Sequence, residues 1–225
     1  MWLALGCHFK ATVMDPIAFF QSFLNKFIPL SDAEFSDIIK PHLQLRRFKR
    51  KQVISAAGEV ERYMNFVGEG IVRKYFKRDD EELNMQISHE GHLIYSQESL
   101  NKETPSHYFL EAIENTTLVS IEFADLNTIF ATNARMERLG RLVATEVTVL
   151  NERWQMMLIK LTPRERFLLF VQRNQQLLQR VPQKLLASLL NIQPETFSRF
   201  KHLIQAESRN ERMRNEEIEQ KPTDG

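Results

Sequence analysis

The chain has 225 residues, a formal net charge of +1, and 43% hydrophobic residues, so it can bury a core and has room for one or two domains. Its single cysteine, Cys7, excludes a disulfide framework and any metal or cluster site built mainly from thiolates. No apolar run approaches the roughly 18 residues of a membrane span. We therefore expect a cytoplasmic protein with no membrane partner, because low cysteine usage suits a reducing compartment.

The first residues form an apolar start that is not expected to be a signal peptide, because no basic region precedes it and Lys10 interrupts it. Met14 opens a stretch with helical spacing of aromatic residues over 17–27. We expect residues 1–13 to be an N-terminal extension without a functional role.

A second helix is expected after the first. Ser31 can cap it, and Glu34 stands three residues on, which is the spacing of a capping box. Pro41 then interrupts the helical pattern.

Residues 43 to 124 have the pattern of a β domain. Turn-prone residues such as Gly58, Gly70 and Gly91 separate short runs that favour strands, namely QLRRFKR, QVISA, YMNFVGEGIVRKYFKR, ELNMQIS, YFLEAIE and TLVSIEF. Many short strands with turns between them predict a sandwich or roll.

Residues 125 to about 159 are expected to be helical. Seven apolar residues there step by three or four, close to a heptad seam held for three heptads: Met136, Leu139, Val143, Val147, Leu150, Trp154 and Met157. One interpretation is a helix packed on its own domain. The length and narrowness of the seam favour the other, a dimerisation helix over 134–159 with its interface at Met136, Leu139, Val143, Val147, Leu150 and Trp154.

A new segment starts near Lys160. Thr162 is a good N-cap, Pro163 stands at the first helical position and Glu165 completes a capping box. We expect one domain over 160–205. Residues 206–225 are charged and are expected to form a frayed helix or a disordered tail.

Basic residues concentrate in this segment. Between Lys160 and Ile204 eight Lys and Arg residues face only Glu165 and Glu195, a net charge of +6 in a chain of +1. A solvated charged face usually mixes both signs. A segment with so few acids is instead typical of domains that bind phosphate backbones.

The stretch RVPQKLLASLLNIQPETFSRF predicts two helices joined by a short turn. The first begins near Pro182 and carries paired leucines, and Asn191 stands where a left-handed residue often ends a helix. Pro194 starts the second.

The second helix has two faces. Phe197, Phe200 and Ile204 form its buried stripe. The opposite stripe has the chemistry of base-edge readout, since Arg donates to guanine and Glu accepts from cytosine; its members are Glu195, Arg199 and His202, with Ser198 alongside. This is the pattern of a helix-turn-helix.

The order of these parts resembles the Crp/Fnr superfamily of bacterial transcription regulators. VPQKLLASLLNIQPETFSRF is similar to the DNA-binding motif of that superfamily, and AAGEVERYMNFVGEGIVRKYF to the start of its sensor domain. The resemblance implies an α+β fold: a double-stranded, jelly-roll-like β-roll for effector sensing over 14–133, the dimerisation helix, and a C-terminal winged-helix or helix-turn-helix domain.

The resemblance also implies partners and a DNA-contact set. The partners are double-stranded DNA, a second copy of the chain in a homodimer, and RNA polymerase. The contact residues are Gln183, Lys184, Gln193, Glu195, Ser198, Arg199 and His202, of which Gln183 and Lys184 face phosphates while Glu195 and Arg199 read bases. Pro194 replaces an arginine common in members that respond to cyclic nucleotides, so the preferred DNA sequence cannot be copied from them.

The resemblance implies an effector pocket, yet its key groups differ here. Nucleotide-binding members use a glutamate for the ribose and an Arg-Ser pair for the phosphate. Ser96 falls at or near the glutamate, Glu98 could replace it after a small shift, and Ser106-His107 replace the Arg-Ser pair. Without a fixed cation a buried phosphate is poorly paired. The candidate pocket is Arg73, Ser96, Glu98, Ser106 and His107, and we expect a different small molecule than cyclic AMP, or none.

No cofactor or metal is expected. Oxygen-sensing members of the superfamily hold an iron–sulfur cluster with several cysteines, which Cys7 alone cannot do. His89 and His92 flank a glycine-containing turn, and we interpret them as a solvated turn because a structural metal site needs more ligands. Nothing in the sequence points to haem.

Two other classes of function compete with a DNA-binding regulator. The first is a ligand-sensing or protein-interaction module without sequence-specific DNA binding, against which the basic segment and the polar stripe argue. The second is an enzyme. The sequence has no serine elbow, phosphate loop, HExxH motif or convincing carboxylate pair, so we expect no catalysis.

Overall fold

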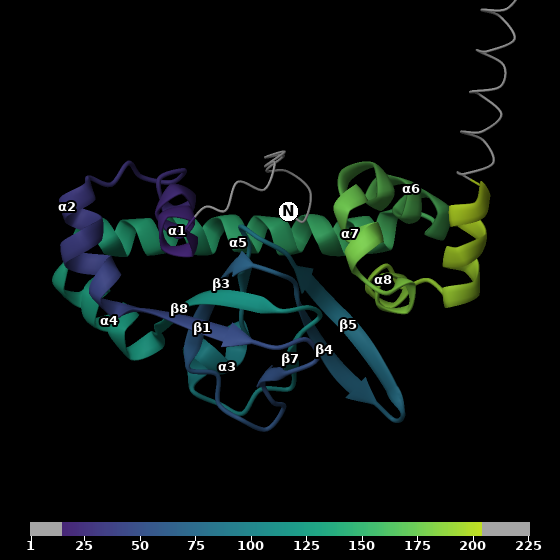
Figure 1. Cartoon of the computed structure of the whole chain (residues 1–225), viewed down its shortest axis with the longest axis horizontal. Helices are drawn as coiled ribbons and strands as arrows, with labels where there is room; N and C mark the ends of the chain where they lie inside the picture. The colour runs from purple at the N-terminus through teal and green to yellow at the C-terminus, as the bar shows by residue number, and fades with distance from the viewer. Residues whose placement is uncertain (1–14, 204–225) are drawn as a thin grey trace, which may run out of the picture. The chain divides into compact units, whose positions relative to one another are not determined.

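The computed structural model describes residues 15–203, which fall into two compact units, one ending at Met156 and one starting at Met157 (Figure 1). The predicted N-terminal extension (1–13) and charged tail (206–225) lie outside the described residues. Each unit is described by itself below.

The first unit opens with short helical segments. Helix α1 spans Pro16–Leu24, and the Asp15 side chain caps it by accepting the N–H of Ala18, so the helix ends earlier than the predicted 17–27. The capping box at Ser31 is confirmed at the start of α2, Asp32–Glu34. A π-helical turn, Phe35–Ile39, and a 3-10 turn containing Pro41, Lys40–His42, follow.

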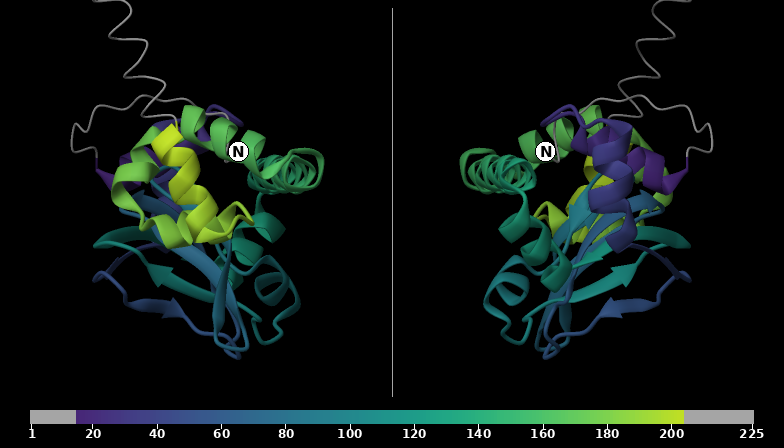
Figure 2. Two further views of the ribbon diagram at one scale, coloured as in Figure 1. Left: turned by 90° about the vertical axis from the view of Figure 1, so that its right-hand side faces the viewer. Right: turned by 90° about the vertical axis from the view of Figure 1, so that its left-hand side faces the viewer.

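The predicted β domain is confirmed as two four-stranded antiparallel sheets. One has the strand order β1-β8-β3-β6 and the other β2-β7-β4-β5, and they form the two walls of a roll (Figures 1 and 2). The strands are β1 Leu43–Phe48, β2 Val53–Ser55, β3 Tyr63–Glu69, β4 Val72–Arg78, β5 Glu81–Ser88, β6 Leu93–Ile94, β7 Phe109–Ala112 and β8 Thr116–Glu122.

Two elements of the roll were not predicted. Strand β6 has only two residues and pairs with β3. Helix α3, Gln97–Lys102, is short and mostly polar. Neither is long enough to show a period in the sequence.

The sheet β1-β8-β3-β6 separates two interiors, because successive side chains of a strand point to opposite faces. On β3, Phe66 joins a large core under the helices, while Val67 joins a smaller core inside the roll. On β8, Val119 and Leu118 divide in the same way.

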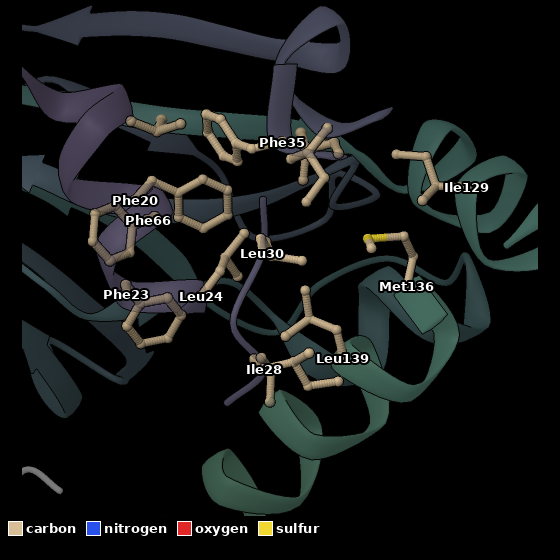
Figure 3. Packing of buried hydrophobic residues seen from close by; sticks show 14 of the residues in the cluster. Phe20, Phe23, Leu24, Ile28, Leu30, Phe35, Phe66, Ile129, Met136 and Leu139 are labelled. Carbon is tan, nitrogen blue, oxygen red and sulfur yellow. The ribbon is translucent and has the colours of Figure 1, made fainter. Parts of the chain in front are cut away.

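The larger core is rich in aromatic residues. The ring of Phe66 contacts those of Phe19, Phe20 and Phe23 at centroid distances of 5.1–5.3 Å. Figure 3 shows this cluster with Met136 and Leu139, which project from α5 toward the side chains of α1. The core thus ties α1, the sheet and α5 into one unit.

Helix α4, Phe123–Thr132, precedes the long helix α5, Ala134–Lys160. The predicted seam is buried within the single chain: Met136, Leu139 and Val143 belong to the large core, Val147 packs against it, and Leu150, Trp154 and Met157 are at most 8% exposed. The alternative interpretation, packing on its own domain, therefore describes at least the first four of these residues. Met136, Leu139 and Val143 are therefore not free to form a dimer interface, which corrects that part of the predicted set. The assignment of Val147, Leu150 and Trp154 to the interface stays a prediction.

The second unit contains helices α6 Pro163–Arg173, α7 Gln175–Arg180 and α8 Gln183–Leu189, and a further helix that includes residues 194–203. The predicted cap of α6 is confirmed, with Thr162 and Glu165 bonded reciprocally. No strand occurs between residues 157 and 203, so the wing of the predicted winged helix has no counterpart in that range.

Candidate functional site

The turn between α8 and the next helix has a defined geometry. Asn191 adopts a φ of 51°, in the left-handed region predicted for it. The N–H of Ile192 donates to the carbonyl of Ala187 at 3.0 Å, and that of Asn191 to Ser188 at 3.0 Å. These two bonds form a Schellman motif, which fixes the direction in which the chain enters the following helix.

Arg166 of α6 holds this turn in place through hydrogen bonds. Its guanidinium donates to the carbonyl of Asn191 at 3.3 Å and to that of Leu158 at 3.1 Å. The side chain is buried, and this burial lowers the pKa of Arg166. A buried arginine bonded to two carbonyls holds α6, the end of α5 and the turn in one arrangement.

Aromatic packing holds the helix of residues 194–203 on α6. The Phe167 ring meets the Phe197 ring edge-on at 4.9 Å and the Phe200 ring at 5.6 Å. Phe197 is fully buried and Phe200 is half-buried, as predicted for the inner stripe. Ile204, its third predicted member, lies outside the described residues.

The predicted DNA-contact residues occupy the outer side of these two helices. Ser198 is half-buried and the other six are exposed: Gln183, Lys184, Gln193, Glu195, Arg199 and His202. Glu195, Ser198, Arg199 and His202 line one shallow surface groove together with Pro194 and Leu203. The structure thus brings the helical stripe together and leaves its hydrogen-bonding ends accessible.

In the first unit, the predicted pocket residue Arg73 already has partners. Its guanidinium makes a two-pronged contact with Glu111 at 3.1 and 3.0 Å, bonds Glu82 at 2.7 Å, and lies 3.9 Å from the Tyr75 ring centroid. Burial opposes the charge, but the hydrogen bonds that Arg73 donates to Glu111 and Glu82 outweigh it and raise the pKa of Arg73. This corrects its assignment to the pocket, because its charge is already balanced.

The other four predicted pocket residues differ in exposure, since Glu98 and His107 are exposed. Ser96 and Ser106 are buried. The hydroxyl of Ser106 bonds the backbone of Tyr108, accepting its N–H at 3.0 Å and donating to its carbonyl at 3.2 Å. Glu98 lies at the surface, where it pairs with Lys102 at 2.9 Å and where the bond from Lys102 and the charges of Lys102 and His107 lower its pKa. The grouping of these residues into one effector pocket stays a prediction.

A charged pair that the sequence analysis missed lies inside the roll. Glu61 is 5% exposed, and one of its carboxylate oxygens, Oε2, has no hydrogen-bond partner among residues 15–203. Burial raises the pKa of Glu61, and backbone N–H groups led by that of Tyr63 partly offset the rise. Its own N–H donates to the hydroxyl of Ser99 in α3 at 2.9 Å.

Lys74 of β4 is the basic member of this pair. Its ammonium donates to the carbonyl of Tyr95 at 3.3 Å and lies 5.5 Å from the Tyr108 ring centroid. Burial lowers its pKa to about 8, and the charge of Glu61 opposes the shift. Strand alternation could have revealed it, since Lys74 shares a face of β4 with the core residue Val72.

A network of hydrogen bonds lies on the roll side of the other sheet, β1-β8-β3-β6. The hydroxyl of Ser120 donates to the Asn65 side-chain oxygen at 2.7 Å, and Arg46 donates to that oxygen at 3.5 Å. Asn65 and Ser120 are fully buried. The interior of the roll therefore holds hydrogen-bond donors, acceptors and ionisable side chains. The resemblance to the Crp/Fnr superfamily implies an effector site in the same interior.

His89 and His92 flank a turn at Glu90-Gly91, as predicted, and both are half-buried rather than fully solvated. Burial and the neighbouring His89 lower the pKa of His92 well below its usual range. The two rings are 4.2 Å apart, and Nδ1 of His92 lies 3.0 Å from the carbonyl of His89. Within the described part of the chain, no group of three or more His, Cys, Asp or Glu side chains is arranged to hold a metal ion.

Comparison with known proteins shows what the fold of the chain is similar to. Residues 45–133 match the family model of the cyclic nucleotide-binding domain. FixK2 from Bradyrhizobium japonicum has a TM-score of 0.63 at 18% identity, over 74% of this chain and 86% of that chain. The c-di-GMP responsive global regulator CLP from Xanthomonas campestris has a TM-score of 0.59 at 18% identity, over 79% of this chain and 93% of that chain.

The Thermus thermophilus catabolite activator protein is also similar, with a TM-score of 0.50 at 20% identity over 86% of this chain and 88% of that chain. No curated protein matches the chain significantly in sequence. Residues 45–133 are thus similar to a cyclic nucleotide-binding domain, and the predicted resemblance of the chain to Crp/Fnr regulators is confirmed at the level of the fold. None of the helices within residues 15–203 is long and apolar enough to cross a membrane.

Proposed function

We propose that this chain is a cytoplasmic, homodimeric transcription regulator of the Crp/Fnr type that binds DNA in a sequence-specific manner and is not an enzyme. The observation that carries the proposal is the exposed polar stripe of Glu195, Arg199 and His202 on a helix held by a buried aromatic face and a fixed turn. RNA polymerase is a partner that the likeness alone implies.

The chemistry of the stripe matches the edges of bases in the major groove. Arg199 offers the paired donors that guanine O6 and N7 accept, and Glu195 can accept from cytosine N4. Lys184 and Gln183 stand in the first turn of α8 and are exposed, so they can contact phosphates. The helix of residues 194–203 acts as the recognition helix of a helix-turn-helix.

Charge supports the same interpretation. Residues 160–204 carry a net charge of +6, although the chain as a whole is nearly neutral. A local positive charge attracts the phosphate backbone, and the contacts on it position the helix without reading sequence.

A second copy of the chain would dimerise along a different face of α5 than the one predicted. Leu142, Val149 and Met156 repeat every seven residues; the first two are half-buried and Met156 is 58% exposed. Leu142 also packs against the large core, so Val149 and Met156 are the accessible members of this row. A seven-residue apolar repeat on an accessible face is the pattern of a two-helix interface.

Cyclic AMP is not the effector in this proposal. Ser106 and His107 replace the Arg-Ser pair of nucleotide-binding members, and Arg73 is held by Glu111 and Glu82. A phosphate entering the roll would meet Glu61, a buried acid. Lys74 is a base in this interior, but it already donates to a carbonyl.

The test is a selection of binding sites from a random pool of duplex DNA with the full chain. A two-fold dimer should enrich a near-palindrome whose half-sites lie about one helical turn apart. Cyclic AMP should change neither the enriched sequence nor the affinity. Failure to enrich any sequence would support the alternative, a sensing or interaction module without sequence-specific DNA binding.

A further inference from the structure

The first unit contains a second interior space, on the helix side of the sheet β1-β8-β3-β6. It is a cavity of about 160 Å³. Its walls come from α1, the π-helical turn Phe35–Ile39, β3, β6, β8, α3, α4 and α5. Figure 3 shows several side chains of the core that borders it, among them Leu24, Ile129, Met136 and Leu139. It is separate from the charged pair inside the roll.

We propose that this cavity is a binding site for a small, neutral and mostly apolar molecule with one hydrogen-bonding end. The lining is made of aliphatic and aromatic side chains, and no Lys, Arg, Asp, Glu or His from the described residues contributes to it. A charged ligand would lose its hydration without a partner there. An apolar cavity of roughly 150 Å³ with a similar lining binds benzene, so a single-ring body fits the space.

The cavity lining includes a few polar side chains that could bond the hydrogen-bonding end of such a molecule. Gln97 and Asn101 of α3 line the cavity and are exposed, so their amides stand at its rim. Tyr95 adds a phenol, and burial raises the pKa of Tyr95, which keeps that hydroxyl protonated at neutral pH. An apolar pocket with a few convergent polar groups is the usual form of a small-molecule site.

One wall depends on a glycine. A Cβ atom placed on Gly140 of α5 would lie 2.4 Å from the tip of the Phe130 ring. Because glycine has none, the ring of Phe130 can lie directly on α5 and close the gap between α4 and α5. Both residues line the cavity.

The size of the cavity argues for a small molecule rather than a second copy of the chain as its occupant. A helix with its side chains is about 10 Å wide, too wide for a space of about 160 Å³. A single-ring molecule would instead contact Leu100 of α3 and Val143 of α5 at once.

The position suggests what binding would do. Helix α3 is bonded to the roll through Ser99 and Glu61, and α5 runs on to Lys160. A ligand between them would change the fit of α5 on the roll. Any effect on DNA affinity rests on the proposed function, whereas binding itself does not.

The experiment uses the full chain with methyl-labelled methionine, and toluene and para-cresol as probes. Met64 and Met136 line the cavity, whereas Met85 and Met156 are exposed at 46% and 58% and do not. We expect saturable shifts of the Met64 and Met136 methyl resonances, little change at Met85 and Met156, and tighter binding of para-cresol than of toluene.

Two variants narrow the cavity, and one is a matched control. Ala144→Phe on α5 adds a ring at the rim, and Leu126→Trp on α4 adds one from another wall. Ala134→Phe adds the same ring at an exposed position of α5 that does not line the cavity. Each of the two narrowing variants should bind para-cresol at least tenfold more weakly than the wild type does, and the control should bind it as tightly as the wild type.

The proposal is overturned if neither probe shifts Met64 and Met136 saturably, or if Ala144→Phe and Leu126→Trp bind para-cresol as tightly as Ala134→Phe. DNA binding is measured separately. Saturable probe binding by a chain that selects no DNA sequence would contradict the proposed function and leave this site in place.

Discussion

The two faces of the sheet β1-β8-β3-β6 differ in chemistry although they belong to the same strands. On the helix side Phe66, Val119 and Ile121 join an apolar core that includes a cavity. On the roll side Asn65 and Ser120 bond each other, near a buried acid and a base. In this chain the buried polar groups lie on the roll side of the sheet, and the uncharged cavity lies on the helix side.

The largest expected change in the free energy of unfolding comes from comparing two adjacent residues of β3 that point to opposite faces of the sheet. Phe66→Ala removes a fully buried ring that contacts three other phenylalanines and should lower the free energy of unfolding by about 4 kcal/mol. Val67→Ala removes a smaller buried side chain from the core inside the roll and should cost about 2 kcal/mol. Urea unfolding measures both, and equal losses would contradict a dominant helix-side core.

The second prediction concerns Lys74, whose pKa burial lowers from 10.5 to about 8. Between these values the unfolded chain binds the proton and the folded chain releases it, so stability rises with pH across this window and is lost as pH falls through the folded pKa. The rise should be roughly 3 kcal/mol. Urea unfolding of the wild type and of Lys74→Met at pH 7 and pH 10 isolates this effect. The free energy of unfolding of the wild type should rise between pH 7 and pH 10 relative to that of the variant. An unchanged difference would place Lys74 in water.

A smaller loss is expected when the polar network of the roll is broken. Asn65→Ala removes the oxygen that accepts from Ser120 and Arg46, leaving the buried Ser120 hydroxyl without that partner, and should cost about 2 kcal/mol. Asn127→Ala on α4 removes an exposed amide and should stay within about 0.5 kcal/mol. If both variants unfold at the same urea concentration, the network contributes nothing.

The smallest effect on stability is expected on the outer face of α5. Met156→Glu replaces a side chain that is 58% exposed and should change monomer stability by less than about 0.5 kcal/mol. It should nevertheless weaken the dimer at least tenfold, because it would bury an unpaired charge in the interface. Met85→Glu is the control on another exposed methionine. Sedimentation that shows the same dimer for both variants would exclude this face.

Local signals in the sequence predicted local structure well. Ser31, Thr162 and Asn191 act through neighbours three to five residues away, so their caps and turn could be predicted from spacing. Strands followed from alternation and turn residues, and the inner stripe of the last helix followed from Phe197 and Phe200.

Contacts between distant residues could not be predicted in this way. A heptad seam shows that a helix buries a narrow stripe, but not whether its own domain or a second copy covers it, and for Met136 to Val147 the domain does. Arg73 looked like a free base because its partner Glu111 lies on another strand. Lys74 was missed because its carboxylate neighbour, Glu61, comes from a different part of the roll.

The central claim is that Arg199 reads a base, and the most direct measurement compares two arginine variants on the DNA sequence that the wild type selects. Arg199→Ala should lose about 2 kcal/mol of binding free energy, roughly thirtyfold in affinity, and should relax one base position. Arg173→Ala removes the same charge from an exposed position on α6 and should weaken binding to all sequences alike, if at all. A selected sequence profile that is identical for Arg199→Ala and wild type would contradict the account.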